Sequence, residues 1–357
     1  MKLRLTAMLL ACALLAACGT PGAPQPPSLE LPTPVTDLAV TRVGDKVTLT
    51  WTPPQLTTDG ATIRHPGPTR ICRSAQTSTM VQCAPIGTLP ASSPPAAPNA
   101  KPTTVSFTDT LPVALQQQDP LGAATYAVEV ANDRGHSAGL SNQVPVPLAP
   151  TLAPPASVEA NVTENAIVLS WRGGERPVVP PQLAFDYHVF RQSGAAAEVD
   201  LGEAAENGDR QFEFADRNFE WQQTYTYHVA AITTVIRSSG GAGPVLGTPS
   251  APVTIEARDV FPPTQPGGVQ AVASGVGQAP FIDLTWAPDT ESDLAGYNVY
   301  RREDGGAPVK ITAELVKAPA YRDAQVQRGH KYFYSVSAVD LRGNESARSA
   351  EASETVP

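Results

Sequence analysis

The sequence predicts an all-β protein made of three tandem antiparallel β-sandwiches that follow a short export segment. Three observations predict this fold class. The 357 residues include 37 prolines, about twice the average usage, and a proline inside a helix removes a backbone N–H and clashes with the preceding turn. Apolar and polar residues alternate over many short segments, as in half-buried strands. One series of such strands recurs three times along the chain.

The first residues have the composition of a secretory signal. Lys2 and Arg4 precede an apolar run from Leu5 to Leu15. This run is shorter than the about 20 residues that a membrane-spanning helix needs. Small residues then lead directly to Cys18. We therefore expect residues 1–17 to be a signal peptide that is removed on export.

The run Leu15-Ala-Ala-Cys-Gly19 resembles the lipobox of bacterial lipoproteins. In that family the cysteine thiol receives a diacylglyceryl group, and the new amino terminus is acylated, with palmitate for example. The resemblance implies a mature protein that begins at Cys18 and is anchored by its lipid in the bacterial cell envelope. Glycine at position 19, where aspartate would imply inner-membrane retention, implies the outer membrane. Plain secretion with an incidental cysteine is the alternative.

Charge and proline content indicate how the folded domains would be attached to a membrane. The net charge of −9 disfavours nucleic acid as a partner and disfavours binding to anionic headgroups, so acyl chains must provide the attachment. Residues 18–33 comprise the lipidated cysteine and a proline-rich segment. Such a segment favours an extended conformation and is expected to be a tether.

The repeats are recognised from a tryptophan that ends a strand with alternating apolar residues. The indole then lies on the same face as the aliphatic side chains before it. A second strand, an acidic strand end and a strand containing a tyrosine follow in each copy. The tryptophans are Trp51, Trp171 and Trp286, the acidic residues are Asp109, Asp216 and Asp323, and the tyrosines are Tyr126, Tyr227 and Tyr334.

With this order of residues, each copy resembles a fibronectin type III domain. The resemblance implies a seven-stranded sandwich with the tryptophan in its core and a tyrosine corner, in which the tyrosine hydroxyl bonds back to the backbone. The expected domains are residues 34–148, 155–258 and 265–357. Short proline-rich joints between them restrict hinge motion, so a semi-rigid rod is expected.

Two cysteines remain outside the export segment. Cys72 falls on the second strand of the first copy and Cys83 on the next strand. In an exported protein two such residues are expected to pair in a disulfide. Two reduced thiols are the alternative.

No catalytic, metal or cofactor motif emerges from the sequence, so no catalytic residue and no cofactor are expected. The five histidines lack zinc-site spacing. The run from Asp289 to Asp293 is the most similar to a calcium site, but it lacks the glycine and distal glutamate of an EF-hand loop, and local turn bonds explain it as well. Trp221, outside the repeated set, is a candidate ligand contact; packing beside Phe219 is the alternative.

These observations bear on three functions. The favoured one is a non-enzymatic, lipid-anchored envelope protein that acts as a spacer or protein-binding rod. The alternative is a carbohydrate- or cell-wall-binding surface lipoprotein that uses Trp221. An enzyme with a site assembled across domains has the least support, because the repeats fill nearly the whole chain. The expected partners are the membrane, through the lipid, and an envelope protein or polysaccharide.

Overall fold

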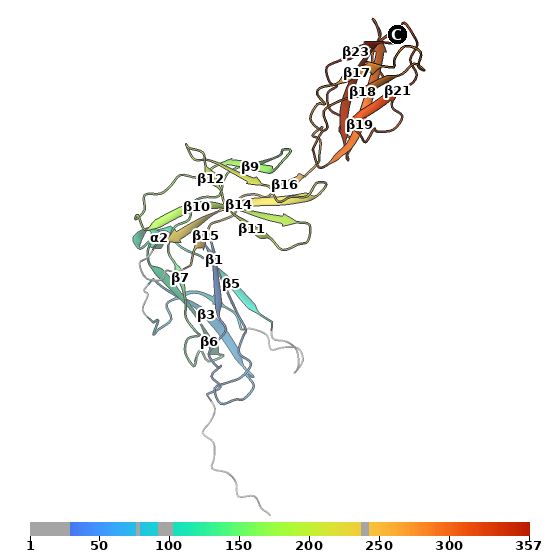
Figure 1. Ribbon diagram of the computed structural model, residues 1–357. Coiled ribbons are helices and arrows are strands. Elements are labelled where there is room, and N and C mark those ends of the chain that lie inside the picture. The colour runs from blue at the N-terminus through green and yellow to red at the C-terminus, as the bar shows by residue number, and fades with distance from the viewer. Residues whose placement is uncertain (1–28, 76–78, 92–102, 237–242) are drawn as a thin grey trace, which may run out of the picture. The chain divides into compact units, whose positions relative to one another are not determined.

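The computed structural model describes residues 29–75, 79–91, 103–236 and 243–357. The described residues form sheets that are antiparallel except for one parallel bridge, and a single short helix (Figure 1). None of their helices is long and apolar enough to cross a membrane. The chain forms two compact units, which consist of Met1–Ala153, Glu175–Asp186 and Ala231–Thr248, and of Pro154–Gly174, Tyr187–Ala230 and Pro249–Pro357. The all-β fold class predicted from the sequence is confirmed.

The first sandwich has a three-stranded layer and a four-stranded layer. The first layer consists of β1 (Ala39–Val43), β2 (Lys46–Trp51) and β5 (Val105–Thr110). The second layer, in the order β4-β3-β6-β7, consists of β3 (Pro66–Ser74), β4 (Pro85–Leu89), β6 (Ala123–Asn132) and β7 (Val144–Pro147). A helix, α2 (Val113–Gln118), follows β5. Strands β2 and β3 alternate buried and exposed positions, which explains the sequence pattern.

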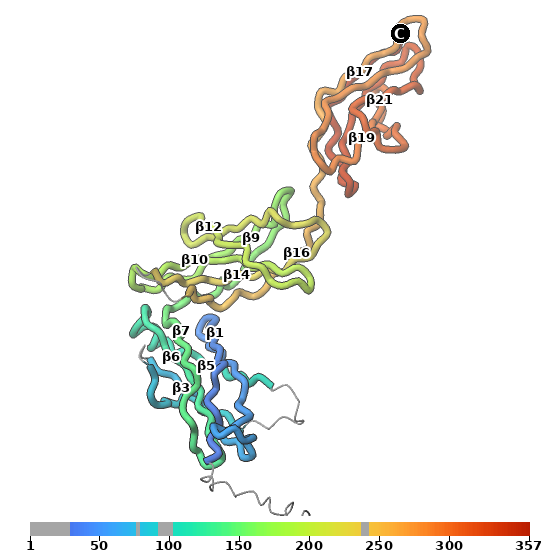
Figure 2. The backbone as a smooth tube through the Cα atoms, turned by 60° about the horizontal axis from the view of Figure 1, so that its bottom comes forward, coloured from blue at the N-terminus to red at the C-terminus, as the bar shows by residue number. Residues whose placement is uncertain are grey.

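The second sandwich repeats these two layers with additional short strands. One sheet, in the order β12-β13-β9-β8, consists of β8 (Val158–Val162), β9 (Ile167–Arg172), β12 (Ala205–Glu206) and β13 (Gln211–Asp216). The other consists of β10 (Leu183–Ser193), β11 (Val199–Glu203), β14 (Thr224–Val235), β15 (Val245–Leu246) and β16 (Val253–Glu256). Figure 2 shows the long neighbouring strands β10 and β14.

The third sandwich matches the expected seven-stranded pattern with the fewest additions. Its three-stranded layer consists of β17 (Gln270–Ala273), β18 (Ile282–Thr285) and β21 (Ala320–Asp323). Its four-stranded layer, in the order β20-β19-β22-β23, consists of β19 (Leu294–Glu303), β20 (Val309–Lys310), β22 (Lys331–Asp340) and β23 (Ala352–Thr355). The two central strands of the latter, β19 and β22, pair from Leu294 to Glu303.

Each recurring tryptophan lies in the core of its own sandwich. Trp51, Trp171 and Trp286 are 2%, 3% and 5% exposed. Trp171 stacks on Phe212, with ring centroids 5.8 Å apart, and Trp286 meets Tyr297 edge to face at 5.2 Å. Burying such large rings stabilises a sandwich mainly through the hydrophobic effect, and aromatic pairs add a smaller term.

The first compact unit also contains a contact that the repeat pattern did not predict. Strand β1 forms a parallel bridge to β15 between Val43 and Leu246, and the Gly44 N–H donates to the Leu246 carbonyl at 2.8 Å. Gly44 has a φ of 58°, and a Cβ there would lie 2.2 Å from Thr248 Oγ1. Both facts require glycine at this position. The proline-rich segment after Leu148 is correspondingly packed, since Ala149 is fully buried.

Candidate functional site

A buried network of three side chains recurs in all three sandwiches. In the second sandwich, Asp216 Oδ2 accepts hydrogen bonds from Arg191 Nη1 at 2.7 Å and from the Tyr227 hydroxyl at 2.8 Å. In the third, Asp323 Oδ2 accepts from Arg301 and Tyr334, and in the first, Asp109 Oδ2 accepts from Arg73 and Tyr126. The arginine of this network was not predicted from the sequence, although it lies near the end of β3, β10 and β19 in the respective copies.

This network raises the pKa of its tyrosine. Burial, and secondly the hydrogen bond to the carboxylate, raise the pKa of Tyr126 and Tyr227 well above the ordinary value. For Tyr334, burial first and then the negative charge of Asp323 raise the pKa. Each hydroxyl therefore keeps its proton and remains a donor. A tyrosine held in this form at neutral pH is a structural group and a poor general base.

The tyrosine corner lies two residues earlier than expected. The expectation that Tyr126, Tyr227 and Tyr334 bond back to the backbone is not met, because their hydroxyls donate to the aspartates. The residues that make the backbone bond are Tyr225, whose hydroxyl accepts from the Glu220 N–H at 2.8 Å, and Tyr332, which accepts from the Gln327 N–H at 3.0 Å. Tyrosines two positions apart share a strand face, and the sequence pattern could not distinguish them.

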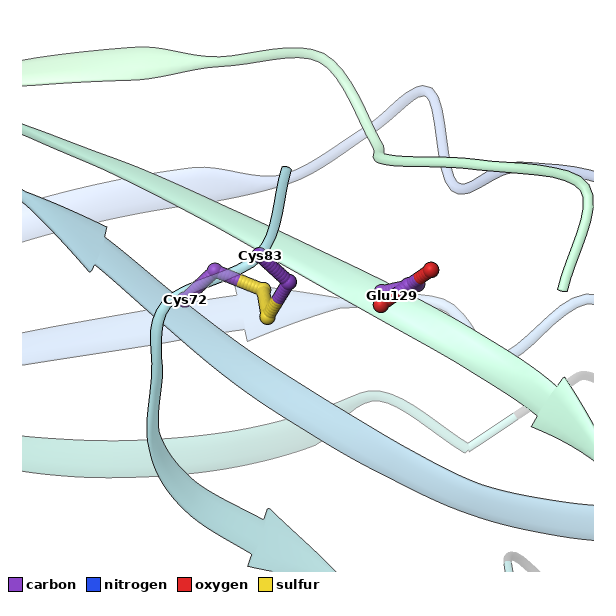
Figure 3. Close-up of side chains that lie close together, drawn as sticks. All are labelled: Cys72, Cys83 and Glu129. Carbon is purple, nitrogen blue, oxygen red and sulfur yellow. A yellow bond between two sulfur atoms is a disulfide. The ribbon is translucent and has the colours of Figure 1, made fainter. Parts of the chain in front are cut away.

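Cys72 and Cys83 form a disulfide in the first sandwich, with Cα atoms 5.1 Å apart. Figure 3 shows the Glu129 carboxylate beside this bond. Glu129 also pairs with Arg70 at 3.3 Å and accepts from the Ser137 hydroxyl. The two sulfur atoms and a Glu129 oxygen lie within 4.8 Å of one another. Because both sulfurs are used in the disulfide, they offer no thiolate to a metal ion.

The two histidines on strands of the second sandwich are half-buried. His188 Nδ1 lies 3.0 Å from Asp200, and His228 Nδ1 lies 3.2 Å from Glu198. The His228 ring also stacks on Phe190, with centroids 5.0 Å apart. Neither histidine belongs to a group of potential metal ligands among the residues described here.

Trp221 lines the pocket that most resembles a binding site. It lies between Phe219, whose ring centroid is 4.8 Å away, and Phe261, at 6.1 Å. Trp221 and Phe261 are both half-buried. The pocket has a volume of about 840 Å³, and all of its lining residues belong to the second compact unit. Its size is within the range of small-molecule sites.

The lining of this pocket is largely acidic. Glu164, Asp259, Glu291 and Asp293 line the pocket together with a single basic residue, Arg342. Glu291 Oε1 accepts from the Thr264 N–H at 2.9 Å, which fixes the start of the third sandwich to its own loop. The pocket therefore combines an aromatic surface with several hydrogen-bond acceptors. Sequence reasoning identified Trp221 and the run from Asp289 to Asp293 separately, but not that they line one pocket, because they lie far apart along the chain.

Three carboxylates in this region could hold a cation. Oxygens of Asp259, Asp293 and Asp340 lie within 4.8 Å of one another. Asp340 is fully used within its turn, because Oδ1 accepts from the Arg342 and Asn344 N–H groups, each at 2.8 Å. Of the calcium-like run in the sequence, only Asp293 belongs to this group. Asp289 Oδ1 instead accepts from the Glu291 N–H at 2.9 Å, as expected for a local turn.

Known proteins match parts of the chain. No protein-family model matches the chain. A solved Fn3-like protein from Clostridium thermocellum is 36% identical and is covered over 96% of its length by 27% of this chain, with a TM-score of 0.24. The chicken CNTN1 FN1–FN3 domains are 16% identical, with coverage of 91% of this chain and 99% of that one and a TM-score of 0.25. The chain has a fibronectin type III-like fold.

Curated relatives of this fibronectin type III-like chain match it over part of their length. An amylopullulanase from Thermoanaerobacterium thermosulfurigenes is 38% identical over 102 residues, which are 28% of this chain and 5% of that protein. Exoglucanase B from Cellulomonas fimi is 28% identical over 264 residues, which are 71% of this chain and 21% of that protein. The chain thus spans about a fifth or less of the length of these relatives.

Proposed function

We propose that this protein is a non-enzymatic, lipid-anchored protein of the bacterial cell envelope whose sandwiches serve as a spacer or present binding surfaces. The recurring buried network is the observation that supports the proposal most directly. In each copy the titratable groups that repeat along the chain, such as Arg191, Asp216 and Tyr227, satisfy one another inside the fold. Groups used in this way stabilise the sandwich and are themselves occupied by structural hydrogen bonds.

The attachment to the membrane is the second part of the proposal. It rests on Cys18 and the apolar run before it, which lie outside the described residues. The outer membrane is the proposed location, because glycine follows the cysteine. Two or more acyl chains on one residue give stable anchoring, whereas one chain gives reversible binding.

Membrane fractionation of the producing bacterium tests the anchor. The wild-type chain is expected in the membrane fraction. Detergent should release it and high salt should not, because acyl chains and not surface charges attach it to the membrane. Cys18→Ser, which removes the acyl acceptor, is expected to move the chain to the soluble fraction or leave it unprocessed. A Cys18→Ser variant that lacks residues 1–17 and still remains in the membrane fraction would contradict lipid anchoring.

Carbohydrate binding is a second candidate function, and two observations favour it. The pocket beside Trp221 joins aromatic and hydrogen-bonding side chains. In addition, the matched relatives are called amylopullulanase and exoglucanase, names of polysaccharide-cleaving enzymes. A pull-down of the purified chain on insoluble polysaccharides tests this function. Retention supports it, and absence of retention on every polysaccharide leaves the chain as a spacer or protein-binding module.

A further inference from the structure

The Trp221 pocket differs from the other surfaces of the chain in its chemistry. Trp51, Trp171 and Trp286 are buried in their sandwiches, whereas Trp221 is half-exposed beside a cavity of about 840 Å³. Phe219 and Phe261 contact its ring. The indole is thus held by two aromatic neighbours and still borders the open pocket. A large rigid ring in such a place provides contact area at low conformational cost.

The lining of the pocket also supplies an acceptor that the fold does not use. Among the described residues the carboxylate of Asp293 has no hydrogen-bond donor, although it is half-buried. Asp259 lies beside it, with carboxylate oxygens within 4.8 Å. Asp259 accepts one hydrogen bond, from the Phe261 N–H at 3.3 Å, so both carboxylates retain acceptor capacity for a ligand that brings hydroxyl groups. Hydrogen bonds from hydroxyls to carboxylates are short and strong.

The charge of the pocket lining disfavours anionic ligands. Four acidic side chains and one arginine line the pocket, so the local potential is negative and repels anions. A ligand with a flat apolar face, many hydroxyl groups and no negative charge matches the lining. Neutral sugar rings have these properties, since their C–H faces pack on aromatic rings and their hydroxyls donate to carboxylates. Acidic polysaccharides match it poorly.

We propose that the pocket lined by Trp221, Phe261, Asp259 and Asp293 binds a short neutral oligosaccharide. The sugar ring packs on the indole, and its hydroxyls donate to the two carboxylates. This inference rests on carbohydrate binding as the second candidate function and assigns that function to one site. Trp221 provides the contact surface, and Asp293 contributes to specificity, because it rewards hydroxyl donors and excludes anions.

Calorimetric titration of the purified full-length chain tests the site. The chain is held in a zwitterionic detergent without a sugar headgroup, so that the detergent does not compete. The probes are glucose hexamers with α-1,4 and with β-1,4 linkages, and a galacturonic acid hexamer is the anionic comparison. Saturable binding of at least one neutral hexamer is expected, with binding of the anionic hexamer at least about tenfold weaker.

Two variants and one matched control locate the binding. Trp221→Ala is expected to weaken binding at least about tenfold, and Asp293→Asn, which preserves shape, about threefold or more. Phe333→Ala removes another half-exposed ring of the second compact unit, outside the pocket, and is expected to bind like the wild type. Because Asp293→Asn is isosteric, it remains informative if Trp221→Ala unfolds.

The possible outcomes distinguish failure of the proposed site from failure of carbohydrate binding or of lipid anchoring. Equal binding by the wild type and both pocket variants would overturn the site while leaving carbohydrate binding intact. Absence of binding to both neutral hexamers, or equal binding of the anionic hexamer, would also overturn it. Retention of all variants in the membrane fraction would show that lipid anchoring stands independently of either result.

Discussion

The first and third sandwiches close the same fold with different side chains. The third uses tyrosines: Tyr297 packs on Trp286, and Tyr332 forms the corner with the Gln327 N–H. Strand pairing places Thr69 and Ala124 at the equivalent positions of the first sandwich, because Arg73 pairs with Tyr126 as Arg301 pairs with Tyr334. The first sandwich lacks both aromatic contacts and has the disulfide between Cys72 and Cys83 instead.

This difference teaches which parts of the fold are interchangeable. The buried tryptophan and the network of arginine, aspartate and tyrosine occur in both sandwiches, so they close the core in each. The corner tyrosine and the disulfide are alternative ways to hold the strands that flank this core. The first sandwich also accommodates α2, whose Gln116 side chain accepts from Arg42 at 3.0 Å and donates to Asp45 at 2.8 Å.

Removing a core tryptophan should have the largest effect and should be similar in both sandwiches. Trp51→Ala and Trp286→Ala are each expected to cost about 3–5 kcal/mol of the stability of their own sandwich, because each leaves a cavity in a packed core. Hydrogen exchange measured strand by strand reports each sandwich separately. A cost below about 1 kcal/mol for either variant would mean that the ring is not a core element.

Removing the disulfide should destabilise the first sandwich and leave the stability of the third unchanged. Replacement of Cys72 and Cys83 by alanine is expected to lower the stability of the first sandwich by about 2–3 kcal/mol, because the unfolded chain regains the freedom of an 11-residue separation. The exchange rates of β19 and β22 should not change. Reduction of the wild type with dithiothreitol provides the control, and an equal loss in the third sandwich would contradict the comparison.

High pH should destabilise both sandwiches through the feature that they share. Burial raises the pKa of Tyr126 and Tyr334 in the folded state above the ordinary value. Stability from these groups is therefore complete below about pH 10 and is lost as the pH rises further, since the unfolded state releases its protons first. Each tyrosine should contribute a loss of about 1.4 kcal/mol per pH unit in this range. Unfolding measured between neutral and alkaline pH tests the slope, which Tyr334→Phe should reduce in the third sandwich alone.

The smallest effect is expected for the corner. Tyr332→Phe keeps the ring and removes the acceptor of the Gln327 N–H, so a loss of about 1 kcal/mol is expected in the third sandwich. Tyr225→Phe should act in the same way in the second sandwich, where the Glu220 N–H loses its acceptor. A loss of stability from Tyr332→Phe as large as that from Trp286→Ala would contradict the view that the corner is an interchangeable feature of the fold.

Sequence patterns predicted the features that repeat and missed those that join distant segments. Alternation located the strands around Trp51, Trp171 and Trp286, because burial on one face dictates a period of two. The parallel bridge between Val43 and Leu246 lies outside the repeat and has no local signal. The same holds for the pocket, which combines Trp221 with residues more than fifty positions away, such as Asp293.

The mass of the intact protein purified from the membrane fraction tests the central proposal most directly. The account predicts a chain that begins at Cys18 and carries a diacylglyceryl group and an amide-linked acyl chain. The mass should also be lower by two hydrogen atoms than that of the reduced chain, because Cys72 and Cys83 are joined in a disulfide. A soluble chain cleaved near residue 17 without acyl groups, or a full-length chain with Cys18 unmodified, would contradict it.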